Sequence, residues 1–205
     1  MFHQHFIAGD PEHKYDHVMG LIDNISEEGE RRIKSVLNEI LELMEERERR
    51  VILRAIRSTG DLDLVGTLRF SRRALDVGPE LVRRGVLVDT RMAREGLGGL
   101  GEYIEPTSRK HRYLAHDIVE SWRDRLEGKA VLIGTSPLVL ERLLDLIYEG
   151  VRPALVIGVP VGFVNALHAK YRLTKQTYVE YITNISVKGG VALGVSIVRA
   201  LMEIE

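Results

Sequence analysis

Three short apolar runs each end in a turn that contains glycine and is followed by a helical pattern. The runs are residues 130–133, 155–157 and 181–183, and their turns contain Gly134, Gly158 with Gly162, and Gly189 with Gly190. Free backbone N–H groups at the start of a helix bind anions, and the helix dipole adds to the attraction. The spacing predicts an anion site made of main-chain amides, at the sheet edge where these strands end. Glycines that only permit tight turns are the alternative.

Two arginines three residues apart offer a side-chain site of the same kind. Arg54 and Arg57 share one face of a predicted helix for which Gly60 is the natural C-cap. A guanidinium donates paired hydrogen bonds to a carboxylate, so a carboxylate-rich ligand is one explanation of the pair. Salt bridges to Asp61 or Asp63 are the other.

The three turns lack the glycine-rich motifs that bind nucleotides. None of them is a GxGxxG or a GxxxxGK[ST] segment, which weakens a nucleotide-dependent Rossmann enzyme as a hypothesis. The sequence also contains no cysteine, which excludes a disulfide framework, a thiolate metal site and a cysteine nucleophile. A cytoplasmic location is therefore favoured.

Four of the seven histidines, His3, His5, His13 and His17, lie near the start of the chain. Imidazole suits nickel, cobalt, copper or zinc, so a divalent metal site is one hypothesis for this segment. The segment has no apolar periodicity, and we therefore expect residues 1–17 to form a mobile tail without a metal site. Residues 18–205 are expected to form a single domain.

The composition is that of an ordinary globular protein. With 205 residues, 44% of them hydrophobic and 29% charged, the chain is long enough to bury a substantial core. Its formal net charge of −1 gives no general attraction to nucleic acid. No apolar run is long enough to span a membrane, and no secretory signal is present.

Periodicity places the elements that would position the candidate groups. One helix is expected from Ser26, as its N-cap, through the arginine pair to Gly60. The other expected elements are helix 74–84, strand 86–88, a loop at 89–97, a flexible glycine-rich loop at 96–101 that could cover a site, helix 109–126 with Trp122 facing inward, and helices 138–147, 163–173 and 191–202. Together with the three apolar runs, this predicts an α/β fold with four strands and a fifth that the pattern does not place.

Four segments of the chain are similar, in order, to the sequence patterns of one protein family. IGVPVGFVNALHAK (157–170) is similar to the family pattern IGxPVGFVxAxESK, and YITNISVKGG (181–190) is similar to YITxxGRKGG. VDTRMAREGL (88–97) resembles DxxMVxxGI, and RVILRAIRSTGD (50–61) resembles VxxRxIHxTGD. Over roughly residues 48–202 the chain therefore resembles the precorrin-8X methylmutase family, also called precorrin isomerase or cobalt-precorrin-8 methylmutase.

The resemblance implies a three-layer α/β/α sandwich around a mostly parallel five-stranded sheet. It also implies a homodimer with active sites near the subunit interface and no organic cofactor. The implied reaction belongs to cobalamin biosynthesis and moves a methyl group between neighbouring carbons of a tetrapyrrole ring, giving hydrogenobyrinate or its cobalt form. The many carboxylates of such a ring suit the amide turns and the arginines, and the shift needs mainly positioning and one proton donor.

The sequence departs from the family pattern at the catalytic histidine, whose position is occupied by Arg57. Arginine remains protonated, so it can donate hydrogen bonds and positive charge but cannot exchange a proton near neutral pH. His116 and His168 are the candidate substitute acids, although each can also be an ordinary structural or surface histidine. A non-catalytic tetrapyrrole-binding paralogue is therefore the alternative function.

The remaining candidates are substrate-binding residues. They are the side chains of Arg54, Thr59, Arg91 and Arg112, and the turns formed by Val161, Gly162 and Phe163 and by Lys188, Gly189 and Gly190.

Overall fold

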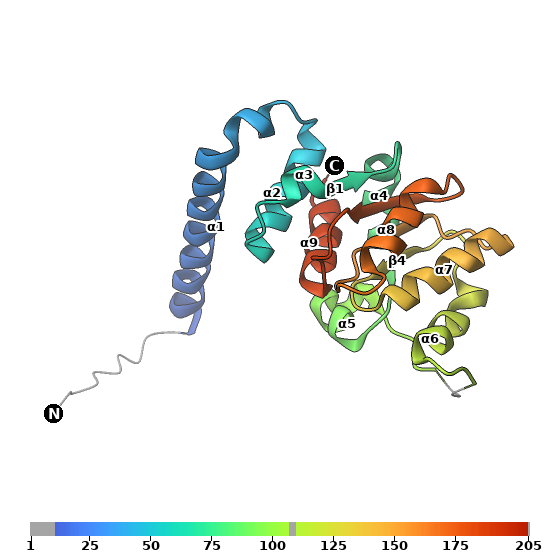
Figure 1. Ribbon diagram of the computed structural model, residues 1–205. Helices are drawn as coiled ribbons and strands as arrows, with labels where there is room; N and C mark the ends of the chain where they lie inside the picture. The colour runs from blue at the N-terminus through green and yellow to red at the C-terminus, as the bar shows by residue number, and fades with distance from the viewer. Residues whose placement is uncertain (1–10, 107–109, 205) are drawn as a thin grey trace.

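The fold is seen in a computed structural model, which describes residues 11–106 and 110–204 (Figure 1). Its helices are α1 (Pro11–Glu42), α2 (Glu46–Thr59), α3 (Leu64–Thr67), α4 (Ala74–Arg83), α5 (Arg91–Leu97), α6 (Leu114–Trp122), α7 (Pro137–Glu149), α8 (Ala166–Lys175) and α9 (Val191–Met202), with short 3₁₀ helices η1 (Gly98–Leu100) and η2 (Arg123–Arg125). Its strands are β1 (Leu68–Phe70), β2 (Val86–Val88), β3 (Gly101–Glu102), β4 (Ala130–Ile133), β5 (Leu155–Gly158) and β6 (Glu180–Asn184).

The strands form one sheet in the order β1-β6-β5-β4-β2-β3. β1 pairs antiparallel with β6 at one edge, and all other pairs are parallel. The mostly parallel sheet is confirmed, but it has six strands in the described part of the chain instead of the expected five. The two strands that the sequence pattern did not place are the short edge strands β1 and β3, which lack the apolar run by which the central strands were recognised.

Uncharged residues form the central strands because both faces of these strands are covered. Every residue of β2, β4 and β5 is buried. Alternate residues face opposite layers: Leu132 packs in the core with α2, α4, α5 and α9, whereas Val131 and Ile133 pack with α6, α7 and α8. Figure 1 shows α7 and α8 on one side of the sheet and α9 on the other. This arrangement confirms the three-layer sandwich.

The N-terminal helix begins earlier than predicted. Helix α1 starts at Pro11, a residue well suited to the first turn of a helix, so Ser26 lies inside the helix and is not its N-cap. Residues 11–17 of the expected tail are therefore helical, whereas His3 and His5 lie outside the described residues. Among the residues described, no helix combines the length and the apolar composition that a membrane span requires.

The expected continuous helix is also interrupted between Glu42 and Glu46. Glu45 has extended backbone angles (φ −59°, ψ 142°), which start a new helix in another direction. The break allows α2 to pack along α9 while α1 stands beside α2 at the side of the domain (Figure 1). Gly60 is the C-cap of α2 as predicted, with a left-handed φ of 71° and its N–H 2.7 Å from the Ile56 carbonyl.

The two loops expected between residues 89 and 101 form regular structure instead. Thr90 caps helix α5 by accepting a hydrogen bond from the Ala93 N–H at 3.2 Å, and α5 continues into η1 and β3. The N-cap Thr90 is the second residue of the segment that was expected to be a loop, so the helix starts within that segment. The glycine-rich segment that follows ends in β3, whose pairing with β2 fixes its position. The glycine-rich segment is therefore part of the scaffold rather than a flexible cover.

Two further helices start later than expected. Helix α6 begins at Leu114 rather than at residue 109, and α8 begins at Ala166 rather than at Phe163. Asn165 explains the second difference, because its positive φ of 63° separates the turn from the helix. Trp122 is fully buried, as predicted.

Close packing of α9 on β4 gives a test of the fold. A Cβ added at Gly194 would overlap the side chain of Leu132, so Gly194→Ala should lower the free energy of unfolding by about 1 to 3 kcal/mol. No atom of the described residues lies within 4 Å of a Cβ added at Gly66 in α3, so Gly66→Ala is the matched control and should not destabilise the protein. Urea denaturation of both variants measures the difference, and equal stabilities would contradict the packing.

Candidate active site

Two turns at the carboxyl edge of the sheet are locked to each other. The turn after β5 and the turn after β6 exchange hydrogen bonds: the Gly162 N–H donates to the Val187 carbonyl at 2.9 Å, and the Gly190 N–H donates to the Val159 carbonyl at 2.8 Å. Gly189 has a φ of 154°, and a Cβ there would overlap the Val159 carbonyl oxygen. Only glycine fits this close approach, so the two predicted turns form one rigid unit.

The interlock limits which amides remain for a ligand. The N–H groups of Gly162 and Gly190 are already used, so the expectation that both turns donate along their whole length is too broad. Of the six predicted turn residues, Lys188 also has its N–H occupied, by Ser186 Oγ at 3.1 Å, whereas the N–H groups of Val161, Phe163 and Gly189 have no hydrogen-bond acceptor among the described residues. Within the predicted set, these three amides are the ones that can bind an anion.

The first of the three glycine turns is closed by a buried carboxylate. Asp89 is 1% exposed, and its Oδ2 accepts hydrogen bonds from the N–H groups of Gly134 at 3.2 Å and Thr135 at 2.8 Å. Burial raises the pKa of the Asp89 carboxyl. These amides therefore serve the fold, and only the other two turns offer free N–H groups.

A small pocket of about 180 Å³ brings Thr59 next to Lys188 and Gly189. The Lys188 ammonium lies 2.8 Å from Asp61 Oδ1 and 2.6 Å from Asp63 Oδ2, and these hydrogen bonds raise the pKa of Lys188. The two aspartates thus pair with Lys188 and not with the arginines of α2. Asp61 is a lining residue that the sequence placed only in a salt bridge.

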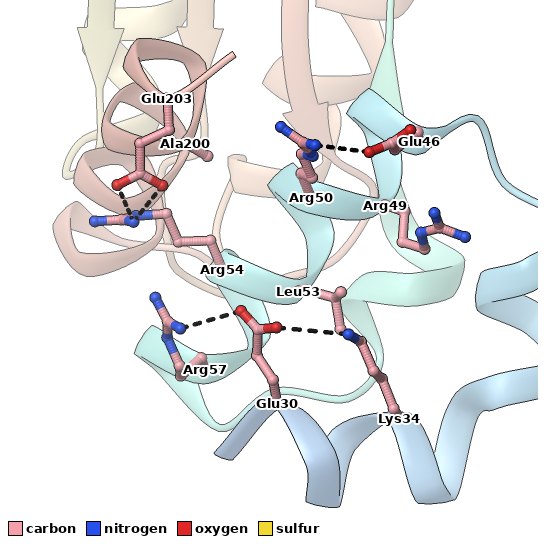
Figure 2. A pocket seen from close by; sticks show the side chains of 10 residues that line it. All are labelled: Glu30, Lys34, Glu46, Arg49, Arg50, Leu53, Arg54, Arg57, Ala200 and Glu203. Atoms are coloured by element: carbon pink, nitrogen blue, oxygen red, sulfur yellow. Dashed lines mark hydrogen bonds and ion pairs between the residues drawn. The ribbon is translucent and has the colours of Figure 1, made fainter. Parts of the chain in front are cut away.

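The predicted arginine pair lines a separate cavity of about 350 Å³ between α1, α2 and α9 (Figure 2). Arg54 contacts Glu203 with N–O distances of 2.5 and 2.7 Å, and Arg57 lies 3.2 Å from Glu30. The lining residues are Glu30, Lys34, Glu46, Arg49, Arg50, Leu53, Arg54, Arg57, Ala200 and Glu203. With five cationic side chains against three carboxylates, this cavity attracts anions even with its internal ion pairs formed.

An open apolar pocket of about 470 Å³ lies beside the turn after β5. It is lined by Phe163, Asn165, Leu167, His168, Tyr171 and Ile185. Phe163 is 91% exposed, which is unusual for so large an apolar side chain. His168, one of the two candidate acids, is exposed and has its Nδ1 3.3 Å from Glu141 Oε1.

The other three candidates lie apart from these pockets. His116 stacks edge-to-face with His111, with ring centroids 5.8 Å apart, and Arg112 lies over the Tyr113 ring at 5.4 Å. Arg91 forms an ion pair with Glu105. Neither these residues nor their partners line the three pockets described above.

Lys170 was not among the predicted site residues, although it lies in the longest segment that resembles the family pattern. Its side chain is fully buried, and its Nζ donates hydrogen bonds to Asn184 Oδ1 at 3.1 Å and to the Lys188 carbonyl at 2.7 Å. Burial lowers the pKa of the Lys170 ammonium to about 8. The sequence signal that could have identified it is a charged residue within the otherwise apolar buried face of α8, which is formed by Ala166, Ala169 and Leu173.

Comparison with known proteins decides the family. The family profile described as Precorrin-8X methylmutase matches residues 24–204. The chain belongs to the precorrin-8X methylmutase family. Among its relatives in this family, a precorrin-8X methylmutase from Pseudomonas aeruginosa is 33% identical over 170 residues, which covers 74% of this chain and 82% of the relative. A cobalt-precorrin-8 methylmutase from Leptospira interrogans is 30% identical over 177 residues, covering 74% and 80%.

Solved structures of the family agree with the fold. The crystal structure of the precorrin-8x methyl mutase from Thermus thermophilus matches with a TM-score of 0.75 and 33% identity, covering 87% of this chain and 96% of that one. A second structure, described as a precorrin-8X methylmutase related protein, has a TM-score of 0.67 at 21% identity and supports the fold alone. The family assignment from the four sequence segments is therefore confirmed.

The lowered pKa of Lys170 makes stability depend on pH in a defined window. Between about 8 and the ordinary lysine value of 10.5, the unfolded chain binds a proton that the folded protein does not bind. The contribution of Lys170 to the free energy of unfolding should therefore rise with pH across this window, by up to about 3 kcal/mol. Urea denaturation of the protein and of Lys170→Met at a series of pH values isolates this contribution. A difference between the two that does not change with pH would contradict the assignment.

Proposed function

We propose that this protein is a methylmutase of cobalamin biosynthesis that acts on a precorrin-8-type tetrapyrrole, metal-free or containing cobalt. The reaction moves a methyl group between neighbouring ring carbons and leaves the composition of the substrate unchanged. The observation that carries the proposal is the locked pair of turns with free amides, in a chain whose relatives are named as methylmutases of this substrate. A cytoplasmic location fits a chain without cysteine.

The pockets suggest how such a substrate binds. The apolar pocket offers Phe163, Leu167 and Tyr171 to the flat face of the macrocycle, which would cover side chains that are now exposed. The free amides of Phe163 and Gly189 lie on the two turns that border this region, and they suit carboxylates at the ring periphery. Apolar contacts to the face of the ring and hydrogen bonds to its peripheral carboxylates would together fix its orientation. Fixed orientation of the reacting groups is the main requirement of an intramolecular shift.

The cavity between α1, α2 and α9 carries more positive charge than the other two pockets. Arg54 and Arg57 are held by Glu203 and Glu30, so a substrate carboxylate would have to replace these carboxylates as partners. A permanently charged Arg57 stabilises negative charge on the substrate but cannot protonate the ring. A separate acid is therefore needed, and His168 is the better placed candidate because it lines the apolar pocket.

In this mechanism His168 donates a proton to the ring system and recovers it after the methyl group has moved. His168→Ala should therefore lower kcat by roughly 10²- to 10⁴-fold, with a much smaller effect on substrate affinity. His116→Ala is the matched control, since His116 stacks against His111 away from the pockets and should retain activity. Turnover that survives in both variants would remove both histidines from the mechanism.

We also propose that the protein works as a homodimer. One stripe of α1, including Ile33, Leu37 and Leu41, packs on the core, whereas Val36 and Ile40 on another stripe are exposed at 67% and 47%. An apolar face that remains exposed on a helix is suited to a second subunit.

Sedimentation of point variants tests this arrangement. Val36→Glu places a charge in the proposed contact and should shift the protein towards a monomer, because a buried unpaired carboxylate is costly. Glu39→Gln on the same helix is the control and should leave the sedimentation coefficient unchanged. A Val36→Glu protein that sediments like the unmodified protein would rule out this face as the contact.

The activity itself is tested by absorbance titration of the purified protein with precorrin-8 and with its cobalt form, followed over time. We expect conversion to hydrogenobyrinate or cobyrinate for at least one of the two. Tight binding without conversion would instead favour the non-catalytic tetrapyrrole-binding paralogue, and absence of binding would overturn the proposal.

A further inference from the structure

A buried positive charge lies beneath the turn after β6 and has no assigned role. The Lys170 side chain is fully buried, and its hydrogen-bond partners among the described residues are the neutral Asn184 side chain and the Lys188 carbonyl. Burying an ammonium without a counter-charge is unfavourable, and the lowered pKa of Lys170 reflects that cost. An apolar residue of similar length would fill the same space at lower cost. The charge therefore calls for an explanation beyond packing.

The contacts of Lys170 converge on one carbonyl group. The Lys188 carbonyl accepts a hydrogen bond from Lys170 Nζ at 2.7 Å and another from Asn184 Nδ2 at 2.8 Å. Asn184 is itself buried, and its Oδ1 accepts from Lys170 Nζ at 3.1 Å. These three groups form a closed triangle that holds the Lys188 carbonyl towards the protein interior.

The position of this carbonyl determines the direction of the next amide. The Lys188 C=O and the Gly189 N–H belong to the same planar trans peptide, so they point in opposite directions. With the carbonyl directed inward to Lys170, the Gly189 N–H is directed away from Lys170. Gly189 lines the small pocket beside Thr59, and its N–H has no acceptor among the described residues.

Without such a restraint, this peptide has another orientation open to it. Gly189 and Gly190 are adjacent glycines with φ values of 154° and 114°, and glycine has few steric barriers to rotation. A flipped peptide would direct the Lys188 carbonyl oxygen outward in place of the Gly189 N–H. The pocket would then present a negative partial charge to an anion and repel it.

We propose that Lys170 is a positioning residue, which together with Asn184 holds the Lys188 carbonyl inward so that the Gly189 N–H faces a carboxylate of the substrate. The proposal rests on the proposed function for the identity of the carboxylate, but the orientation of the peptide is a property of the protein alone. A neutral side chain at position 170 would fill the space and lose the orientation. A second role follows from position, because the buried charge also adds to the attraction of the site for anions.

Lys170→Met tests the proposal, with Lys129→Met at the exposed opposite end of the sheet as the matched control. We expect the Kd for precorrin-8 to rise by roughly 10- to 100-fold in Lys170→Met, the range for loss of a charge-assisted hydrogen bond. KM should rise by a similar factor while kcat changes less, and Lys129→Met should behave like the unmodified protein. A folded Lys170→Met protein with Kd within about twofold of the unmodified protein would overturn the proposal.

Asn184→Asp provides a second, nearly isosteric variant in case Lys170→Met does not fold. It keeps an acceptor for Lys170 but replaces the N–H donor to the Lys188 carbonyl with a second oxygen. We expect Kd to rise here as well, because the two oxygens repel and weaken the inward orientation. Unchanged affinity in a folded Asn184→Asp protein would count against the triangle as the restraint.

A measurement without substrate separates this inference from the proposed function. In protein labelled with ¹⁵N-glycine, the Gly189 amide resonance should shift or split in Lys170→Met, whereas the resonance of Gly60, at the C-cap of α2, should stay in place. If the unmodified protein fails to bind precorrin-8 but the Gly189 resonance moves, the proposed function fails and the positioning role stands. If the Gly189 resonance is the same in both proteins, the positioning role is wrong whatever the substrate.

Discussion

The close approach of Gly189 to the Val159 carbonyl is the contact on which the candidate site depends. It lets the turns after β5 and β6 lie against each other, and the hydrogen bonds of Gly162 and Gly190 then fix their relative position. Because these contacts join main-chain atoms, a change of side-chain rotamer does not alter the relative position of the two turns. The apolar pocket on one turn and the small pocket on the other consequently have a fixed separation, which suits a rigid, flat ligand.

The charged side chains around the two turns form ion pairs, so a ligand carboxylate must compete with a carboxylate of the protein for each cation. Lys188 is held by two aspartates, Arg54 by Glu203 and Arg57 by Glu30. Most of these side chains are partly exposed, so each pair contributes little to stability and can be exchanged for a new partner at small cost. Lys170 differs from them, because its buried ammonium has only neutral partners and cannot be released to solvent. The site thus combines exchangeable surface charge with one fixed interior charge.

The central sheet and the identity of the turns were predictable because the relevant signals are local. The uncharged runs at residues 130–133 and 155–157, and the glycines that follow them, identify buried parallel strands and their turns without any tertiary information. The edge strands β1 and β3 were harder to find because two or three residues carry no periodicity. The break between α1 and α2 was missed since the apolar stripe continues across it, and only packing against α9 shows where the helix must turn.

The ion-pair partners of the site residues could not be predicted, because they are distant in the sequence. Arg54 and Glu203 are 149 residues apart, and Lys188 and Asp61 are 127 residues apart, so no local pattern connects them. The alternative of salt bridges from the arginines to Asp61 or Asp63 predicted the kind of interaction but not the partners. The arginines pair with Glu203 and Glu30, and the two aspartates pair with Lys188. Of the six predicted turn amides, three are excluded only by the structure, because those of Gly162 and Gly190 bond across the two turns and that of Lys188 bonds to Ser186.

Helix α1 carries two features that are usually separate. Glu30 contacts Arg57 in the cavity between α1, α2 and α9. Six residues further along the same helix, Val36 belongs to an apolar stripe that is exposed. If a ligand carboxylate that replaces Glu30 as the partner of Arg57 also shifts α1, the exposed apolar residues around Val36 move with the helix. Thermodynamic reciprocity would then require that a partner covering these residues changes the affinity at Arg57 by the same factor as the ligand changes the affinity for that partner.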